Sequence, residues 1–103
     1  DRTSRGLGDV YKRQYKETSN KIILKESISY YKNGQMSYKV EYDSNGLNMR
    51  KTWWYNNGNK SKLVTFKDGK IDGIWTTWKY DGEKEIERFY KNGLMLKERS
   101  YTK

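Results

Sequence analysis

The chain has 103 residues, a formal net charge of +9 at pH 7, and nearly equal shares of hydrophobic (33%) and charged (34%) residues. It contains no His and no Cys, which excludes Ser-His-Asp and Cys-His catalytic arrangements, disulfide bonds and thiolate metal sites. The longest aliphatic run is Ile22 to Leu24, so the sequence predicts no transmembrane helix. We therefore expect one small domain with a thin core, no cofactor and no enzymatic activity.

The first fourteen residues differ in character from the rest. The stretch from Gly6 to Gln14 resembles translated read-through of a sequencing adaptor, and the chain does not begin with Met. We interpret residues 1–14 as an artefact and residues 15–103 as a β-repeat domain; a genuine flexible leader is the alternative. Without residues 1–14 the net charge is +7. The localisation stays open: cytoplasmic if the natural chain has no leader, secreted or lipoprotein if it has one.

Six Asn-Gly or Asp-Gly dipeptides divide the remaining chain at intervals of 11 to 13 residues. Their glycines are Gly34, Gly46, Gly58, Gly69, Gly82 and Gly93. Asn-Gly and Asp-Gly tolerate positive φ at both central positions, which the type I′ turn of a two-residue β-hairpin requires. The segments between dipeptides are too short for an ordinary capped helix but fit strands of about 5–8 residues. Every second dipeptide gives a repeat of about 24 residues.

Side-chain alternation between these turns predicts strands. Apolar side chains occupy every second position from Met36 to Tyr42, and the same period recurs from Ile74 to Tyr80. We predict seven strands, near residues 22–31, 35–42, 47–55, 60–67, 74–80, 84–90 and 94–101. Because short turns make consecutive strands antiparallel, the expected fold is all-β, a hairpin meander in a single twisted sheet. Its aromatic face either closes partly on itself or stays exposed.

Two segments resemble a known repeat. Gly69 to Trp75 reads Gly-Lys-Ile-Asp-Gly-Ile-Trp and Tyr30 to Gln35 reads Tyr-Tyr-Lys-Asn-Gly-Gln, which is similar to the MORN-repeat variant over roughly residues 25–99. Proteins of this kind are often labelled YwqK-family antitoxins of toxin–antitoxin systems. The resemblance implies a β-hairpin repeat, adds Gly73 to the turn glycines, and implies an antitoxin that binds a partner protein. The segment from Gly46 to Lys51 lacks the second glycine and the Trp, so that unit is degenerate or serves as a cap.

Four tryptophans are the candidate binding residues: Trp53, Trp54, Trp75 and Trp78. Exposed aromatic rings can stack on sugars, on bases or on the apolar surface of a partner. Trp53 and Trp54 are adjacent, so they point to opposite faces of a regular strand and one of them is expected to face solvent. The alternative is that these rings fill the inner face and pair across strands.

Three glutamates, Glu83, Glu85 and Glu87, alternate along one predicted strand and would share a face. Such a group could form an acid/base or cation site. Their Lys and Arg neighbours favour an ordinary solvated strand face, and the aspartates occur where turns are expected. We therefore predict no catalytic, cofactor-binding or metal-binding residue.

Three non-catalytic functions fit the sequence. The leading hypothesis is a protein-interaction module whose partner is a toxin or an envelope protein. The second is binding of nucleic acid or anionic lipid, suggested by the positive charge and by lysines interleaved with Tyr and Trp. The third is a cell-surface module, because the composition also resembles choline-binding repeats, whose period is shorter. No small-molecule substrate is predicted. The lysines are spread without a dense run, which weakens the second hypothesis; examples are Lys32, Lys51, Lys60, Lys67, Lys79, Lys91 and Lys97.

Overall fold

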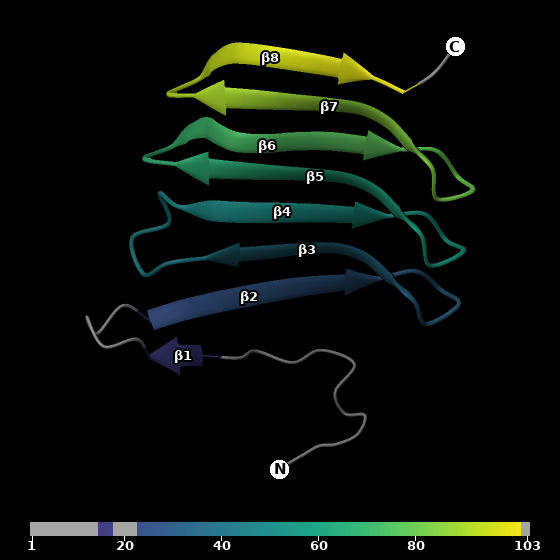
Figure 1. Ribbon diagram of the computed structural model, residues 1–103. Coiled ribbons are helices and arrows are strands. Elements are labelled where there is room, and N and C mark those ends of the chain that lie inside the picture. The colour runs from purple at the N-terminus through teal and green to yellow at the C-terminus, as the bar shows by residue number, and fades with distance from the viewer. Residues whose placement is uncertain (1–14, 18–22, 102–103) are drawn as a thin grey trace.

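A computed structural model describes residues 15–17 and 23–101, which form one open antiparallel β-sheet (Figure 1). In chain order the strands are β1 (Tyr15–Glu17), β2 (Ile23–Tyr30), β3 (Met36–Tyr42), β4 (Met49–Trp54), β5 (Lys60–Lys67), β6 (Lys70–Trp78), β7 (Lys84–Lys91) and β8 (Leu94–Ser100). Their order in the sheet is their order in the chain. The predicted all-β hairpin meander is confirmed, with the seven predicted strands as β2 to β8. Residues 1–14, and the interpretation made for them, lie outside the described residues.

The sheet is a single layer, in which the strand pairs in close contact are consecutive ones. Among the described residues, the only buried apolar side chain is Val64 of β5, which is 3% exposed. Thr52 of β4 and Thr76 of β6 are buried on the neighbouring strands. The aromatic side chains of the middle strands are mostly half-buried. No helix in the described part of the chain is long and apolar enough to cross a membrane.

Three turns on one side of the sheet, after β2, β4 and β6, share one geometry (Figure 1). In the first of them, the N–H of Tyr31 donates to the carbonyl of Gln35 at 2.8 Å, and the N–H of Gly34 donates back to the carbonyl of Tyr31 at 3.0 Å. The side chain of Asn33 accepts the N–H of Gln35 at 2.9 Å. These bonds define a three-residue hairpin loop that ends in a left-handed glycine. The turns at residues 55–59 and 79–83 repeat the same bonds.

The type I′ prediction therefore holds at two of the six dipeptides and is wrong at four. Both residues have positive φ in Asp68-Gly69 (51° and 81°) and in Asn92-Gly93 (50° and 83°), which join β5 to β6 and β7 to β8. At the other four dipeptides, only the glycine has positive φ. The reason is that each of these loops holds one or more residues beyond the dipeptide, so the turn precedes the glycine.

Hydrogen bonds at a spacing of 23 residues tie each long turn to the next one. The hydroxyl of Tyr31 donates to the carbonyl of Trp54, and that of Tyr55 donates to the carbonyl of Trp78 at 2.7 Å. The amides of Asn33 and Asn57 donate in the same way to the carbonyls of Asn56 and Tyr80. These ladders cross from one hairpin to the next, so the approximately 24-residue repeat is a physical unit of stability.

The opposite side of the sheet has a corresponding ladder. The N–H of Gly69 donates to the carbonyl of Leu47 at 2.9 Å, and that of Gly93 donates to the carbonyl of Ile71 at 2.8 Å. The side chain of Asn48 accepts the N–H of Asp68 at 3.1 Å. Asp72 accepts the N–H of Asn92 in the same way at 3.0 Å. The segment predicted to be a degenerate unit therefore keeps the ladder contacts through Leu47 and Asn48, although it lacks the second glycine and the Trp.

Gly73 differs from the prediction because it lies within β6 and not in a turn. The Asp68-Gly69 turn closes a two-residue hairpin, so β6 begins directly at Lys70, four residues earlier than predicted. Gly73 has φ +95° and lies opposite the register shift between Val64 and Phe66. There the hydroxyl of Thr65 accepts the N–H of Ile74 at 3.0 Å and donates to the carbonyl of Asp72. Gly73 is therefore a bulge glycine.

Candidate binding surfaces

The four tryptophans separate into two pairs on opposite faces of the sheet. Trp53 lies opposite both Tyr38 and Lys62, and Trp75 lies opposite Val64, two residues along β5 from Lys62. Residues directly opposite in an antiparallel pair share a face, so Trp53 and Trp75 lie on one face, called here the Trp53 face. Strand alternation places Trp54 and Trp78 on the other, the Trp54 face. All four indoles are half-buried, so Trp53 and Trp54 each meet solvent in part, on opposite faces.

The Trp53 face carries a row of rings and cations across five strands, β3 to β7. The Tyr38 and Trp53 rings are 5.1 Å apart between centroids. The Nζ atom of Lys62 lies 5.1 Å from the Trp53 centroid and 5.5 Å from that of Trp75. The guanidinium carbon of Arg88, on β7, lies 4.3 Å from the Trp75 centroid. Trp53 and Trp75 therefore each have a cation within the range of a cation–π interaction, and Tyr38 contacts the Trp53 ring.

Few carboxylates accompany these cations. Glu98 lies 3.6 Å from Arg88, and Glu85 accepts a hydrogen bond from Thr77 at 3.4 Å. Lys51 lies 5.2 Å from the centroid of Phe66. Among the described residues, neither Lys51 nor Lys62 forms an ion pair. The Trp53 face therefore presents ammonium groups that are held against aromatic rings and are not neutralised by carboxylates.

Burial also changes the polar groups of this face. It raises the pKa of the Tyr38 hydroxyl above its ordinary value, because the charged form loses contact with water. The Nε atom of Arg88 is buried without a hydrogen-bond partner among the described residues. The Arg88 side chain is thus held by its stacking on Trp75 and by its ion pair with Glu98.

The Trp54 face, in contrast, pairs much of its charge. Arg50 binds Glu41 at 3.1 Å and Lys84 binds Glu87 at 3.1 Å. Hydrogen bonds from Lys84 and then from Tyr101 hold the pKa of the Glu87 carboxyl below its ordinary value. A shallow hollow of about 230 Å³ on this face is lined by Trp54 and by side chains of both charge signs, including Glu41 and Arg50. This face is therefore a mixture of both signs.

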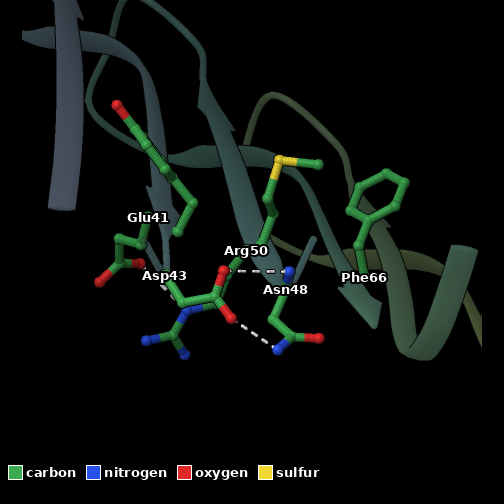
Figure 2. Close-up of a pocket in the computed structure, with 7 residues that line it drawn as sticks. Glu41, Asp43, Asn48, Arg50 and Phe66 are labelled. Carbon is green, nitrogen blue, oxygen red and sulfur yellow. Dashed lines mark hydrogen bonds and ion pairs between the residues drawn. The ribbon is translucent and has the colours of Figure 1, made fainter. Parts of the chain in front are cut away.

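A second hollow of about 340 Å³ lies where β3 ends and β4 begins, and its polar groups are already used within the chain (Figure 2). Asp43 is 8% exposed, and its carboxylate accepts the side-chain amide of Asn48 at 2.6 Å and the backbone N–H of Asn48 at 3.5 Å. Arg50 lies alongside and binds Glu41. These contacts close the loop between β3 and β4, so we assign the hollow a structural role.

The three glutamates considered from the sequence do not converge. Glu83 lies in the turn before β7, 3.6 Å from Lys79, and Glu85 is the residue skipped by the register shift between β6 and β7. Glu87 is the one held in the regular ladder. The described residues contain no group of three His, Cys, Asp or Glu side chains that could hold a metal ion.

The edge strand β8 is a feature that sequence analysis did not single out. Every residue of β8 is exposed, and Leu94, Met95 and Leu96 are 67%, 46% and 64% exposed. In the described part of the chain β8 pairs with β7 on one side only (Figure 1). The available signal was the run Leu94 to Leu96, which breaks the alternation of a strand with one polar face.

Searches against family models, curated proteins and solved structures found no match to this chain. The resemblance to the MORN-repeat variant therefore rests on the turn motifs alone. A function has to be argued from the two faces and the β8 edge.

Proposed function

We propose that the chain is a non-catalytic protein-interaction module that binds a partner by adding a strand of that partner to β8. The single observation that supports this proposal is the exposure of all of β8, at the edge of the sheet, with Leu94, Met95 and Leu96 among the most exposed apolar residues. An edge strand presents unpaired N–H and C=O groups, which another chain can complete by main-chain hydrogen bonds.

The hydrogen bonds of β8 indicate which amide is free to pair. The N–H of Tyr101 donates to the carbonyl of Glu85 at 2.9 Å, on the β7 side. Because N–H groups alternate in direction along an antiparallel strand, the N–H of Glu98 points away from β7. An added strand would accept this N–H. It would also cover part of Leu94 and Leu96, at about 25 cal/mol for each Å² of apolar surface removed from water.

The chemistry of the chain supports a binding role over a catalytic one. The sequence has no His or Cys, and Glu83, Glu85 and Glu87 each contact a different partner. The resemblance to antitoxin-labelled proteins makes a toxin the first partner class to test, and an envelope protein is the second.

The test uses two substitutions at one position. Glu98→Pro removes the outward N–H while leaving the inward bonds to β7, and Glu98→Ala removes the same side chain but keeps the N–H. The wild-type chain and both variants would each be tagged, expressed in the organism that encodes the wild-type chain, and purified from it. We expect one stoichiometric protein partner with wild type and Glu98→Ala, and its loss with Glu98→Pro. Absence of any stoichiometric partner for the wild type, or equal recovery with Glu98→Pro, would contradict the proposal.

A further inference from the structure

The Trp53 face has features that the β8 edge does not explain. Its rings and cations alternate across β4 to β7, in the order Trp53, Lys62, Trp75 and Arg88. We infer that the Trp53 face binds single-stranded nucleic acid, with bases stacked on the exposed parts of the indoles and phosphates paired with Lys51 and Lys62. This second binding site is independent of strand addition at β8.

Charge complementarity favours a polyanion on this face. The chain carries a net charge of +9, and Lys51 and Lys62 have no carboxylate partner among the described residues. Held against Phe66 and against two indoles, their ammonium groups are already partly removed from water. A phosphate would therefore gain an unopposed cation at each of these positions and would displace no internal ion pair.

The spacing of the rings suits a strand of nucleotides. Trp53 and Trp75 lie on β4 and β6, two strands apart, which corresponds to about 10 Å across the sheet. The Nζ atom of Lys62 lies between them. Both indoles are half-buried, so part of each ring meets solvent. Bases on the two indoles would thus place the connecting backbone over Lys62, which is the arrangement of aromatic platforms and cations used by single-strand binding sheets.

The Trp54 face is the less suitable surface. Its ladder contains Glu26 opposite Glu41, and Glu87 pairs with Lys84. A phosphate chain would meet these carboxylates and would have to break the pairs of Arg50 and Lys84. The two faces therefore differ in what they can bind, although each carries two tryptophans.

Single strands fit better than duplexes. Stacking requires exposed base planes, which a duplex hides. The part of the chain that the structure describes forms one eight-stranded sheet, whose broad face has no helix or two-stranded ribbon that could enter a groove. Duplex DNA and anionic vesicles are therefore outcomes to be tested against the single strand.

The first experiment measures fluorescence anisotropy of labelled oligo(dT) and oligo(U) of about 12 nucleotides with the full chain, at several salt concentrations. The charge-matched pair is Lys51→Gln/Lys62→Gln on the Trp53 face and Lys39→Gln/Lys97→Gln on the Trp54 face. We expect the first double variant to weaken binding roughly tenfold and to lower the slope of log K against log salt by about 1.4. The second should change affinity by about twofold or less. Equal losses would overturn the inference, because they would show a response to net charge alone.

The second experiment tests stacking. In Trp54→Phe/Trp78→Phe, the remaining indoles report the Trp53 face, and we expect oligonucleotide to quench their fluorescence. In Trp53→Phe/Trp75→Phe, we expect little quenching. The inference fails if duplex DNA or polyglutamate binds as tightly as the single strand, or if vesicles of phosphatidylcholine and phosphatidylserine bind while oligonucleotides do not.

Discussion

Side chains at the centre of this sheet are buried, whereas apolar side chains at its β8 edge are exposed. At the centre, Thr76 of β6 is 2% exposed and Val64 of β5 is 3% exposed, whereas Leu94 and Leu96 of β8 are 67% and 64% exposed. A threonine is thus far better buried than a leucine. In a single-layer sheet, burial depends on having a strand on each side, so position in the strand order outweighs the hydrophobicity of the residue. Stability should therefore concentrate at β5 and β6, and capacity for binding at β8.

The largest effect is expected at the bulge in β6. A Cβ added at Gly73 would lie 2.8 Å from the Thr65 hydroxyl, which is fixed by two backbone hydrogen bonds, at φ +95°. Gly34 has nearly the same φ, +93°, with no atom within 4 Å of the added Cβ. We expect Gly73→Ala to lower the free energy of unfolding by about 3 kcal/mol and Gly34→Ala by about 1–2 kcal/mol. Urea denaturation of both variants measures the difference. Equal losses of stability would show that the Thr65 side chain moves away from the added Cβ without a loss of free energy.

A second comparison removes apolar atoms from the centre and from the edge. Val64→Ala should cost about 2 kcal/mol, because two buried methyl groups are lost between β4 and β6. Leu96→Ala removes more apolar atoms but from an exposed side chain, so we expect a change within about 0.5 kcal/mol. Thermal and urea unfolding would test both. A comparable loss at Leu96 would mean that β8 is covered in solution.

The ladder between long turns offers a smaller test. The Tyr55 hydroxyl donates to the carbonyl of Trp78 at 2.7 Å in a half-buried setting, and Tyr55→Phe should cost about 1 kcal/mol. The Tyr80 hydroxyl donates to the side chain of Asn56 at an exposed site, so Tyr80→Phe should be nearly neutral. Each change keeps the ring and removes one hydroxyl. The same unfolding measurement compares them, and no difference between them would argue against the repeat ladder as a stabilising contact.

The smallest effect concerns pH at the outer strands. The pKa of the Glu87 carboxyl is lowered in the fold from 4.5 by hydrogen bonds from Lys84 and Tyr101. A carboxyl with a lowered folded pKa stabilises the fold above its unfolded pKa, and this contribution is lost as pH falls through the folded value. We therefore expect Glu87→Gln to be less stable than wild type at pH 7, with the difference shrinking as pH falls below about 4.5. Unfolding curves at pH 7 and pH 3 measure this, and an unchanged difference would contradict the assignment.

The strands β2 to β8 could be predicted from the sequence because Asn-Gly and Asp-Gly mark each reversal of the chain between them. β1 was not predicted, because no such dipeptide lies between it and β2. The type of each turn could not be predicted, because it depends on which residues flanking the dipeptide hydrogen-bond to each other. In the first long turn these residues are Tyr31 and Gln35. Gly73 looked like a turn residue, and its role as a bulge depends on Thr65 in the strand beside it.

The candidate surfaces were predicted in part. Adjacency places Trp53 and Trp54 on opposite faces, but the row formed by Lys62, Trp75 and Arg88 depends on the register of three strands. Strand register is set by bulges and loop lengths, which no single motif encodes. The β8 edge was missed because exposure depends on the strand order and not on the composition of Leu94 to Leu96.

Amide hydrogen exchange of the free chain would test the contrast between centre and edge most directly. We expect the amides of β5 and β6 to be protected, because each strand has a partner on both sides. Amides of β8 that point away from β7, such as that of Glu98, should exchange rapidly. Protection of those amides equal to that of β5 would contradict the account, because it would show that the β8 edge is already paired in the free protein.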